Sequence, residues 1–86
     1  MYVVHTDDEV RAALEQLPAS ASTAVAELRV ALEVSPWTVA PSINPANEKA
    51  AVRCLLLETP EGEGLVWYQV TESLNRVDLL RLSWYS

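Results

Sequence analysis

Residues 51–86 read AVRCLLLETPEGEGLVWYQVTESLNRVDLLRLSWYS, and this stretch decides the fold. It holds three runs rich in branched and aromatic residues, Ala51–Glu58, Leu65–Thr71 and Val77–Tyr85. A proline and two glycines separate the first two runs, and Asn75 stands before the third. Runs of this length bounded by turn-forming residues are typical of β-strands. The stretch therefore predicts three consecutive strands of one sheet.

The residues before this stretch predict a short extended segment, Tyr2–His5, and then a helix. Thr6 and Glu9 have the spacing of a capping box, in which two side chains satisfy N–H groups at a helix start. The apolar face of this helix is formed by Val10, Ala13, Leu14 and Leu17. Pro18 ends the helix, because proline cannot continue the hydrogen-bond pattern.

A second helix is expected to begin near Ser20 or Ser22, since either hydroxyl can cap a helix start. Its apolar face is formed by residues that recur at helical spacing, namely Ala21, Val25, Leu28 and Leu32. The helix ends by Val34, because Ser35 precedes a proline and is pushed out of the helical region. The short link between the helices predicts an antiparallel hairpin that lies across one face of the sheet.

The segment from Ser35 to Asn47 carries three prolines and no periodic pattern, which predicts an ordered loop or a lid. The complete order is strand, helix, helix, strand, strand, strand. This order predicts a single α+β domain over residues 1–86, in which the helical hairpin packs on one face of an antiparallel sheet.

Composition limits the classes of function. The chain has 86 residues, of which 50% are hydrophobic, and a formal net charge of −6 from 6 basic and 12 acidic residues. The negative charge opposes general attraction to nucleic acid, so any phosphate site must be local. The single cysteine forms no intramolecular disulfide and fits a reducing cytoplasm. No segment has the length and apolarity of a membrane span, and no motif indicates a metal or a cofactor.

Alternation along the strands predicts which side chains lie on the sheet face away from the helices. In the last strand, Asp78, Leu80, Leu82 and Trp84 are expected to face the helices, and Val77, Leu79, Arg81, Ser83 and Tyr85 to face away. One consistent assignment puts polar residues of all three strands on the open face: Arg53, Trp67 or Gln69, Arg81, Ser83 and Tyr85. Cys54 is expected on the helix side as a small buried hydrophobe. A bulge would invert these assignments beyond it.

The chain resembles the RelE/ParE superfamily of toxins from bacterial toxin–antitoxin systems. The resemblance runs through the whole chain and rests on the order of elements and on three pieces of sequence. These are Arg53 in the first of the three strands, the Trp67-Tyr68-x-Val70-x-Glu72 pattern, and the last strand with Arg81 and Tyr85. One branch of the family ends in a His-Tyr pair, where this chain has Trp84-Tyr85.

The resemblance implies two kinds of activity. Ribonuclease members cut messenger RNA on the ribosome, where side chains on the open sheet face hold the scissile phosphate while the 2′-hydroxyl attacks. ParE-like members inhibit DNA gyrase. Both kinds are neutralised by a cognate antitoxin, so the resemblance implies an antitoxin as partner and, for the first kind, the ribosome and mRNA.

Cleavage by a 2′-hydroxyl needs a base, a cation for the phosphate and an acid for the leaving oxygen. Arg53 and Arg81 are candidates for the cation, and Tyr85 is a candidate donor or stacking platform for an unpaired base. Glu48 is the candidate base, although a solvated surface charge is the safer interpretation of this residue. His5, the only histidine, lies at a position that the family does not use for chemistry.

Three hypotheses remain from the sequence. The first is a toxin-like, ribosome-dependent ribonuclease, which the net charge and the missing terminal histidine oppose. The second is a non-catalytic protein-binding member of the same fold, including a ParE-like gyrase inhibitor. The third is a homodimeric domain with an apolar interface on the open face, formed by Leu55, Leu57, Leu65, Trp67, Val77 and Leu79.

Overall fold

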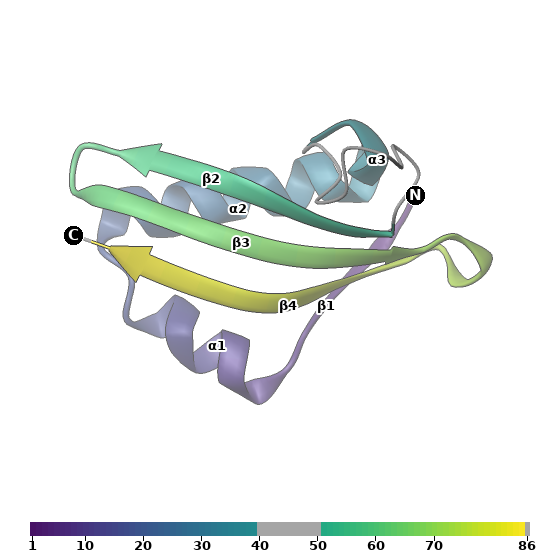
Figure 1. The fold of residues 1–86 in the computed structure, drawn as a ribbon, viewed down its shortest axis with the longest axis horizontal. Coiled ribbons are helices and arrows are strands. Elements are labelled where there is room, and N and C mark those ends of the chain that lie inside the picture. Colours follow the sequence, from purple (N-terminus) through teal and green to yellow (C-terminus); the bar gives the residue numbers. More distant parts are fainter. Residues whose placement is uncertain (40–50, 86) are drawn as a thin grey trace.

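The computed structural model describes residues 1–39 and 51–85 and shows a four-stranded sheet with helices packed against it (Figure 1). The elements are β1 (Val3–Thr6), α1 (Asp8–Glu15), α2 (Ala19–Val34), α3 (Pro36–Val39), β2 (Val52–Thr59), β3 (Gly62–Thr71), the 3-10 turn η1 (Glu72–Leu74) and β4 (Arg76–Tyr85). The predicted order of strands and helices is confirmed, and α3 and η1 are additions to it.

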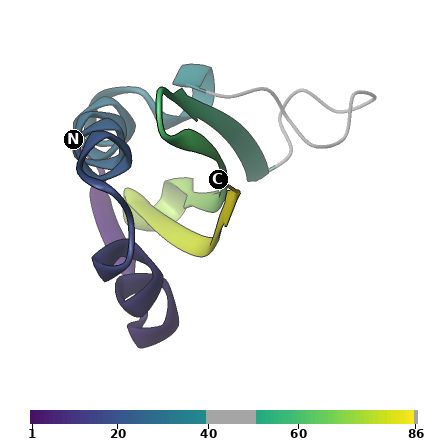
Figure 2. The ribbon, with the colours of Figure 1, turned by 90° about the vertical axis from the view of Figure 1, so that its left-hand side faces the viewer.

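The sheet has the strand order β1-β4-β3-β2. Strands β2, β3 and β4 are antiparallel to their neighbours, as predicted. The first strand runs parallel to β4, however, so the sheet is mixed and the prediction of an antiparallel sheet is wrong for β1. The crossover through α1 and α2 makes this possible, because parallel strands need a long connection. Figure 2 shows both helices on the same side of the sheet.

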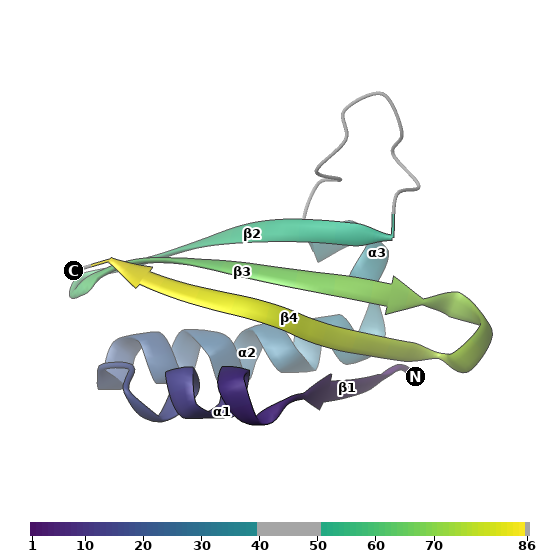
Figure 3. The same cartoon turned by 60° about the horizontal axis from the view of Figure 1, so that its bottom comes forward.

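The two long helices run in opposite directions, as expected for a hairpin (Figure 3). The capping box at Thr6 is not formed: the N-cap of α1 is Asp7, whose Oδ1 accepts from the Val10 N–H at 2.8 Å. Helix α2 begins at Ala19 without a side-chain cap, earlier than either predicted serine, and it ends at Val34 as predicted. No helix among the described residues is long and apolar enough to cross a membrane.

The core lies between the helices and the sheet. The predicted face of α2 is confirmed, because all four of its residues are buried: Ala21, Val25, Leu28 and Leu32. Beneath them lie buried side chains of the sheet, namely Val4, Leu57, Val66, Tyr68, Val70, Val77 and Leu79. Burying each of the larger aliphatic side chains contributes about 1.5–3 kcal/mol to folding. Because the helices cover this face of the sheet, the opposite face is the open face.

A β-bulge in β4 changes which side chains reach the open face. Trp67 of β3 pairs with Arg81 and the next residue, Tyr68, pairs with Leu79, so Leu80 is the extra residue. Before the bulge, Val77 and Leu79 are buried beneath the helices, and the prediction for these two is wrong. Leu80, predicted on the helix side, is 44% exposed. After the bulge the predicted alternation holds.

The alternation predicted for β2 is inverted. Arg53 pairs with the buried Tyr68, whereas Cys54 pairs with Trp67, and paired residues project to the same face of a sheet. Arg53 therefore lies on the helix side, and Cys54 lies half-buried on the open side. Four residues of the expected apolar interface, Leu55, Leu57, Val77 and Leu79, also pack on the helix side. Most residues of the predicted apolar interface therefore do not lie on the open face, and this prediction is wrong for them.

The beginning of the expected loop is ordered. Pro36 is the first residue of α3 and follows Ser35. Proline is favourable at this position, because the N–H that it lacks would have no partner within the helix. The hydroxyl of Tyr68 donates to the carbonyl oxygen of Pro36 at 2.8 Å. Since Tyr68 is the central buried side chain of β3, this bond fixes α3 to the core. The prediction that this segment is ordered is therefore confirmed for Pro36–Val39, although these residues form a short helix and not a loop. The rest of the segment, 40–47, lies outside the described residues.

Candidate functional site on the open sheet face

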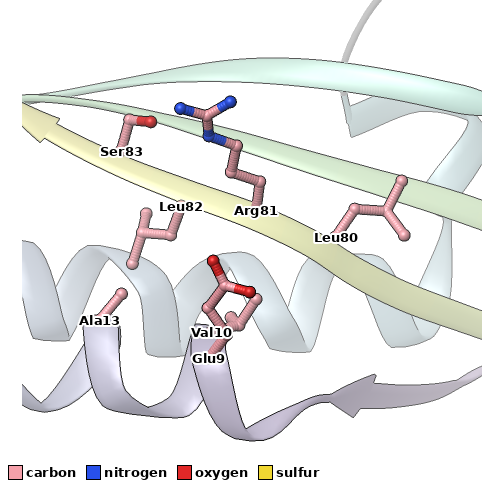
Figure 4. A pocket seen from close by; sticks show the side chains of 7 residues that line it. All are labelled: Glu9, Val10, Ala13, Leu80, Arg81, Leu82 and Ser83. Carbon is pink, nitrogen blue, oxygen red and sulfur yellow. The ribbon is translucent and has the colours of Figure 1, made fainter.

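The candidate site centres on a row of three side chains across the sheet. Cys54 of β2, Trp67 of β3 and Arg81 of β4 are direct neighbours on the open face. The guanidinium carbon of Arg81 lies 5.6 Å from the centre of the Trp67 ring, which is within cation–π range. Figure 4 shows the Arg81 side chain extending from β4 across β3, on the side away from α1. The structure thus confirms that Arg81 lies on the open face.

Ser83 and Tyr85 follow Arg81 on the same face. In Figure 4, Arg81 and Ser83 point away from α1, whereas Leu82 points toward Ala13 of that helix. Tyr85 is 59% exposed, and about 13 Å separates its Cα from that of Arg81, because each strand residue advances about 3.3 Å. One phosphate cannot rest against both backbones. Arg81 and Tyr85 would therefore contact adjacent parts of an extended ligand.

The end of the open face near Tyr85 is acidic. Tyr85 pairs with Glu63 of β3, which in turn pairs with Glu58 of β2, so two carboxylates stand beside the tyrosine. Like charges directly opposite each other in a sheet repel, and an anionic ligand would meet the same repulsion. The sequence pattern does not place these two glutamates here, because their position depends on the register among β2, β3 and β4.

Arg53 is not part of this site. It is 4% exposed on the helix side, and its guanidinium carbon lies 5.1 Å from the centre of the Trp37 ring. Because Trp37 belongs to α3, Arg53 packs α3 against the sheet and does not reach a ligand on the open face. The structure therefore does not bring Arg53 together with Arg81 and Tyr85. The fourth predicted residue, Glu48, lies outside the described residues.

A second arginine on the open face is already paired. Arg76 donates from Nε at 3.0 Å and from Nη2 at 2.9 Å to one carboxylate oxygen of Asp78. His5 is the strand partner of Asp78 and is exposed beside it. Asp78 was expected beneath the helices, and the bulge explains this error. Among the residues that the structure describes, Arg81 forms no ion pair.

Cys54 is a poor candidate nucleophile, and the part of the chain that the structure describes holds no metal site. Burial raises the pKa of the Cys54 thiol, which disfavours the reactive thiolate. The expectation that Cys54 faces the core is wrong, although the residue is half-buried. Within residues 1–39 and 51–85, no group of His, Cys, Asp and Glu side chains could hold a metal ion.

Outside the open face, Glu72 ties three elements together. Its carboxylate accepts from the Tyr2 hydroxyl at 2.6 and 2.8 Å and from Trp37 Nε1 at 2.8 Å. The hydrogen bond from Tyr2, followed by that from Trp37, lowers the pKa of Glu72. The bond to Glu72 also raises the pKa of Tyr2. Glu72 thus joins the N-terminal residues, α3 and the turn before β4, and no sequence pattern indicated this contact.

We expect Glu72 to make stability depend on pH in the acid range. Because its pKa is lower in the folded chain than in the unfolded chain, its contribution is present above the ordinary glutamate pKa of about 4.3 and is lost as pH falls below that value. Thermal melting followed at several pH values should show a shallower acid slope for Glu72→Gln than for the wild type. The exposed Glu27→Gln on α2 is the control, and equal slopes for all three proteins would contradict this expectation.

Comparison with known proteins supports the fold. No family profile matches the sequence, and no curated protein sequence matches it. The structure is similar to a chain of the intact E. coli RelBE toxin–antitoxin complex, with a TM-score of 0.80, 14% identity and coverage of 100% of this chain and 99% of that one. It is also similar to the RelBE2 complex from Mycobacterium tuberculosis, with a TM-score of 0.74, 22% identity and 98% coverage of both chains.

The isolated E. coli RelE toxin is a third similar structure, with a TM-score of 0.72, 13% identity and coverage of 100% of this chain and 86% of that one. The resemblance seen in the sequence is therefore matched in three dimensions over the whole chain, at identities that reveal fold and not activity. The chain has the fold of the RelE toxins.

Proposed function

We propose that this chain is a toxin-like protein of a toxin–antitoxin system and that it acts through its open sheet face. The observation that carries the proposal is Arg81, which stands on that face against Trp67 and forms no ion pair with the described acidic residues. A guanidinium in this state presents N–H donors to an anionic group of a target. The fold shared with RelE toxins supports the same conclusion.

This face holds fewer of the candidate catalytic residues than the sequence predicts. Arg81 can hold a phosphate, and Tyr85 can stack on or donate to an adjacent nucleotide. Arg53, the second candidate cation, is buried on the other side of the sheet. Ribosome-dependent cleavage of mRNA remains the first form of the proposal, with Arg81 as the cation and Tyr85 as the neighbouring contact. The base would come from Glu48.

A protein target is the second form of the proposal, and the acidic end of the open face favours it. Glu58 and Glu63 beside Tyr85, together with the net charge of −6, suit a basic protein surface better than RNA. DNA gyrase is the protein target that the resemblance to ParE-like toxins implies. We further propose that a cognate antitoxin, encoded beside this chain, neutralises it in the cytoplasm, because two of the similar structures are toxin–antitoxin complexes.

Expression in bacteria tests the proposal. We expect induction of the wild-type chain to arrest growth and Arg81→Ala to relieve the arrest, because removing a group that stabilises developing charge lowers rates by about 10²–10³. Arg11→Ala is the matched control: it changes the net charge equally but lies on α1, where Arg11 forms an exposed pair with Asp8 at 3.8 Å. Absence of arrest by the wild type, or equal relief by both variants, would contradict the proposal.

Two further measurements separate the forms of the proposal. Cleavage of ribosome-bound mRNA during arrest, mapped by primer extension, would support the ribonuclease. Loss of gyrase supercoiling activity with intact mRNA would support the protein target. Co-expression of the small protein encoded next to this chain should restore growth in either case.

A further inference from the structure

Trp67 is the side chain on which the position of Arg81 depends. The two residues are direct partners of the antiparallel β3–β4 pair, a relation in which Cβ atoms lie about 4.5–5.5 Å apart. The guanidinium carbon is 5.6 Å from the ring centre, so the cation rests over the indole. The extra residue Leu80 creates this pairing, since an uninterrupted ladder would put Leu80 opposite Trp67 and turn Arg81 toward the helices.

The indole is held more firmly than the cation that it supports. Trp67 is half-buried in the inner strand β3, with Cys54 as its partner on one side and Arg81 on the other. Arg81 is exposed, and its long side chain has many rotamers when nothing holds it. The contact with Trp67 therefore restricts Arg81, and not the reverse.

Stacking leaves the binding capacity of the guanidinium intact. A cation–π contact is made with the ring face and uses none of the guanidinium N–H groups as a hydrogen-bond donor to an oxygen. A carboxylate partner would occupy the donors, as Asp78 does at Arg76. An aromatic partner restricts the cation without occupying its donors with a carboxylate.

We infer that Trp67 is a positioning residue, which orders Arg81 in advance for an anionic group bound on the open face. The inference rests on the proposed function for the identity of the ligand, but the contact between the two side chains can be tested without it. An exposed cation–π contact changes an equilibrium by about two- to fivefold, and this is the expected effect of Trp67 on binding through Arg81.

The side-chain Nε–H signal of Arg81 in an NMR spectrum tests the contact itself. In the wild type, we expect the ring current of Trp67 to shift this signal from its position in a free arginine. Trp67→Leu should return it to that position, and Trp67→Phe should leave part of the shift. An unshifted wild-type signal, or one that Trp67→Leu does not move, would overturn the inference. The Arg76 signal is the internal control.

Binding of a fluorescent ten-nucleotide uridine RNA at low salt tests the consequence. Trp67→Leu should weaken binding about two- to fivefold in the wild-type background and should have no effect in Arg81→Ala. Equal weakening in both backgrounds would show that Trp67 contacts the RNA directly and would overturn the positioning role. If the wild type does not bind this RNA, the RNA form of the proposed function fails, and the NMR result alone decides the inference.

Discussion

Deleting Leu82 should destabilise the protein by more than about 3 kcal/mol, whereas deleting Leu80, two residues earlier, should cost about 1 kcal/mol or less. Leu80 is the extra residue of the bulge, so its loss joins the two halves of β4 into a regular ladder. Leu82 and Trp84 then still face the helices, and Arg81 still pairs with Trp67.

Deletion of Leu82 cannot be accommodated by closing the bulge. If the bulge stays, Ser83 moves to the helix side and Trp84 leaves its place beside α1, where it borders a hollow with Ala13 and Leu17. If the bulge closes, Arg81 turns toward the core, where an unpaired charge is costly. Urea unfolding followed by circular dichroism measures both variants. A larger loss for the Leu80 deletion would show that the bulge has a stabilising role of its own.

Replacing Tyr68 by alanine should cost about 3–5 kcal/mol, a large fraction of the stability of a domain of this size. The side chain is 0% exposed in the inner strand, and its hydroxyl holds the Pro36 carbonyl. Truncation leaves a cavity beneath α2 and removes the contact that fixes α3.

Two companion variants separate the causes of this loss. Tyr68→Phe keeps the ring and removes only the hydrogen bond, so it should cost about 1–3 kcal/mol. Tyr85→Ala makes the same truncation at an exposed position and should change stability by less than about 0.5 kcal/mol. Chemical denaturation provides all three values, and a similar loss for Tyr85→Ala and Tyr68→Ala would contradict the burial argument.

The parts of the fold that could be predicted are those with an unambiguous period. The α2 face has apolar residues at helical spacing, and the alternation of Val66, Tyr68 and Val70 in β3 is confirmed by their burial. In both elements a single period describes every residue. Local pattern therefore sufficed for the presence and order of α1, α2 and the inner strand, but not for α3.

The errors arise in two places. One is a run of apolar residues that does not alternate with polar ones, and the other is a strand in which a bulge reverses the alternation. Residues 54–57 of β2 are apolar without alternation, so nothing local tells which of them face the helices, and pairing with β3 decides. In β4 the bulge reverses the phase within one strand. Arg53 is the instructive case, because a charged residue was assigned to the open face when its partner, the Trp37 ring, was not visible in the sequence.

The candidate site was predictable only in part for the same reason. Arg81 and Tyr85 follow the bulge and were correctly placed, whereas the pairing of Trp67 with Arg81 depends on the register between two strands. Glu58 and Glu63 needed the same register. Single-strand periodicity gives the face of a residue, and only the ladder gives its neighbours.

The position of β4 in the sheet also has a consequence for synthesis. The strand nearest the C-terminus lies between β1 and β3, and the backbone N–H of Val3 donates to the carbonyl oxygen of Asn75 at 2.9 Å. A nascent chain that ends before β4 can pair β2 with β3, but β1 has no neighbour. Contacts between such distant residues slow folding, because the loop must close before they form. The row of Cys54, Trp67 and Arg81 on the open face is therefore complete only after β4 has paired with β3.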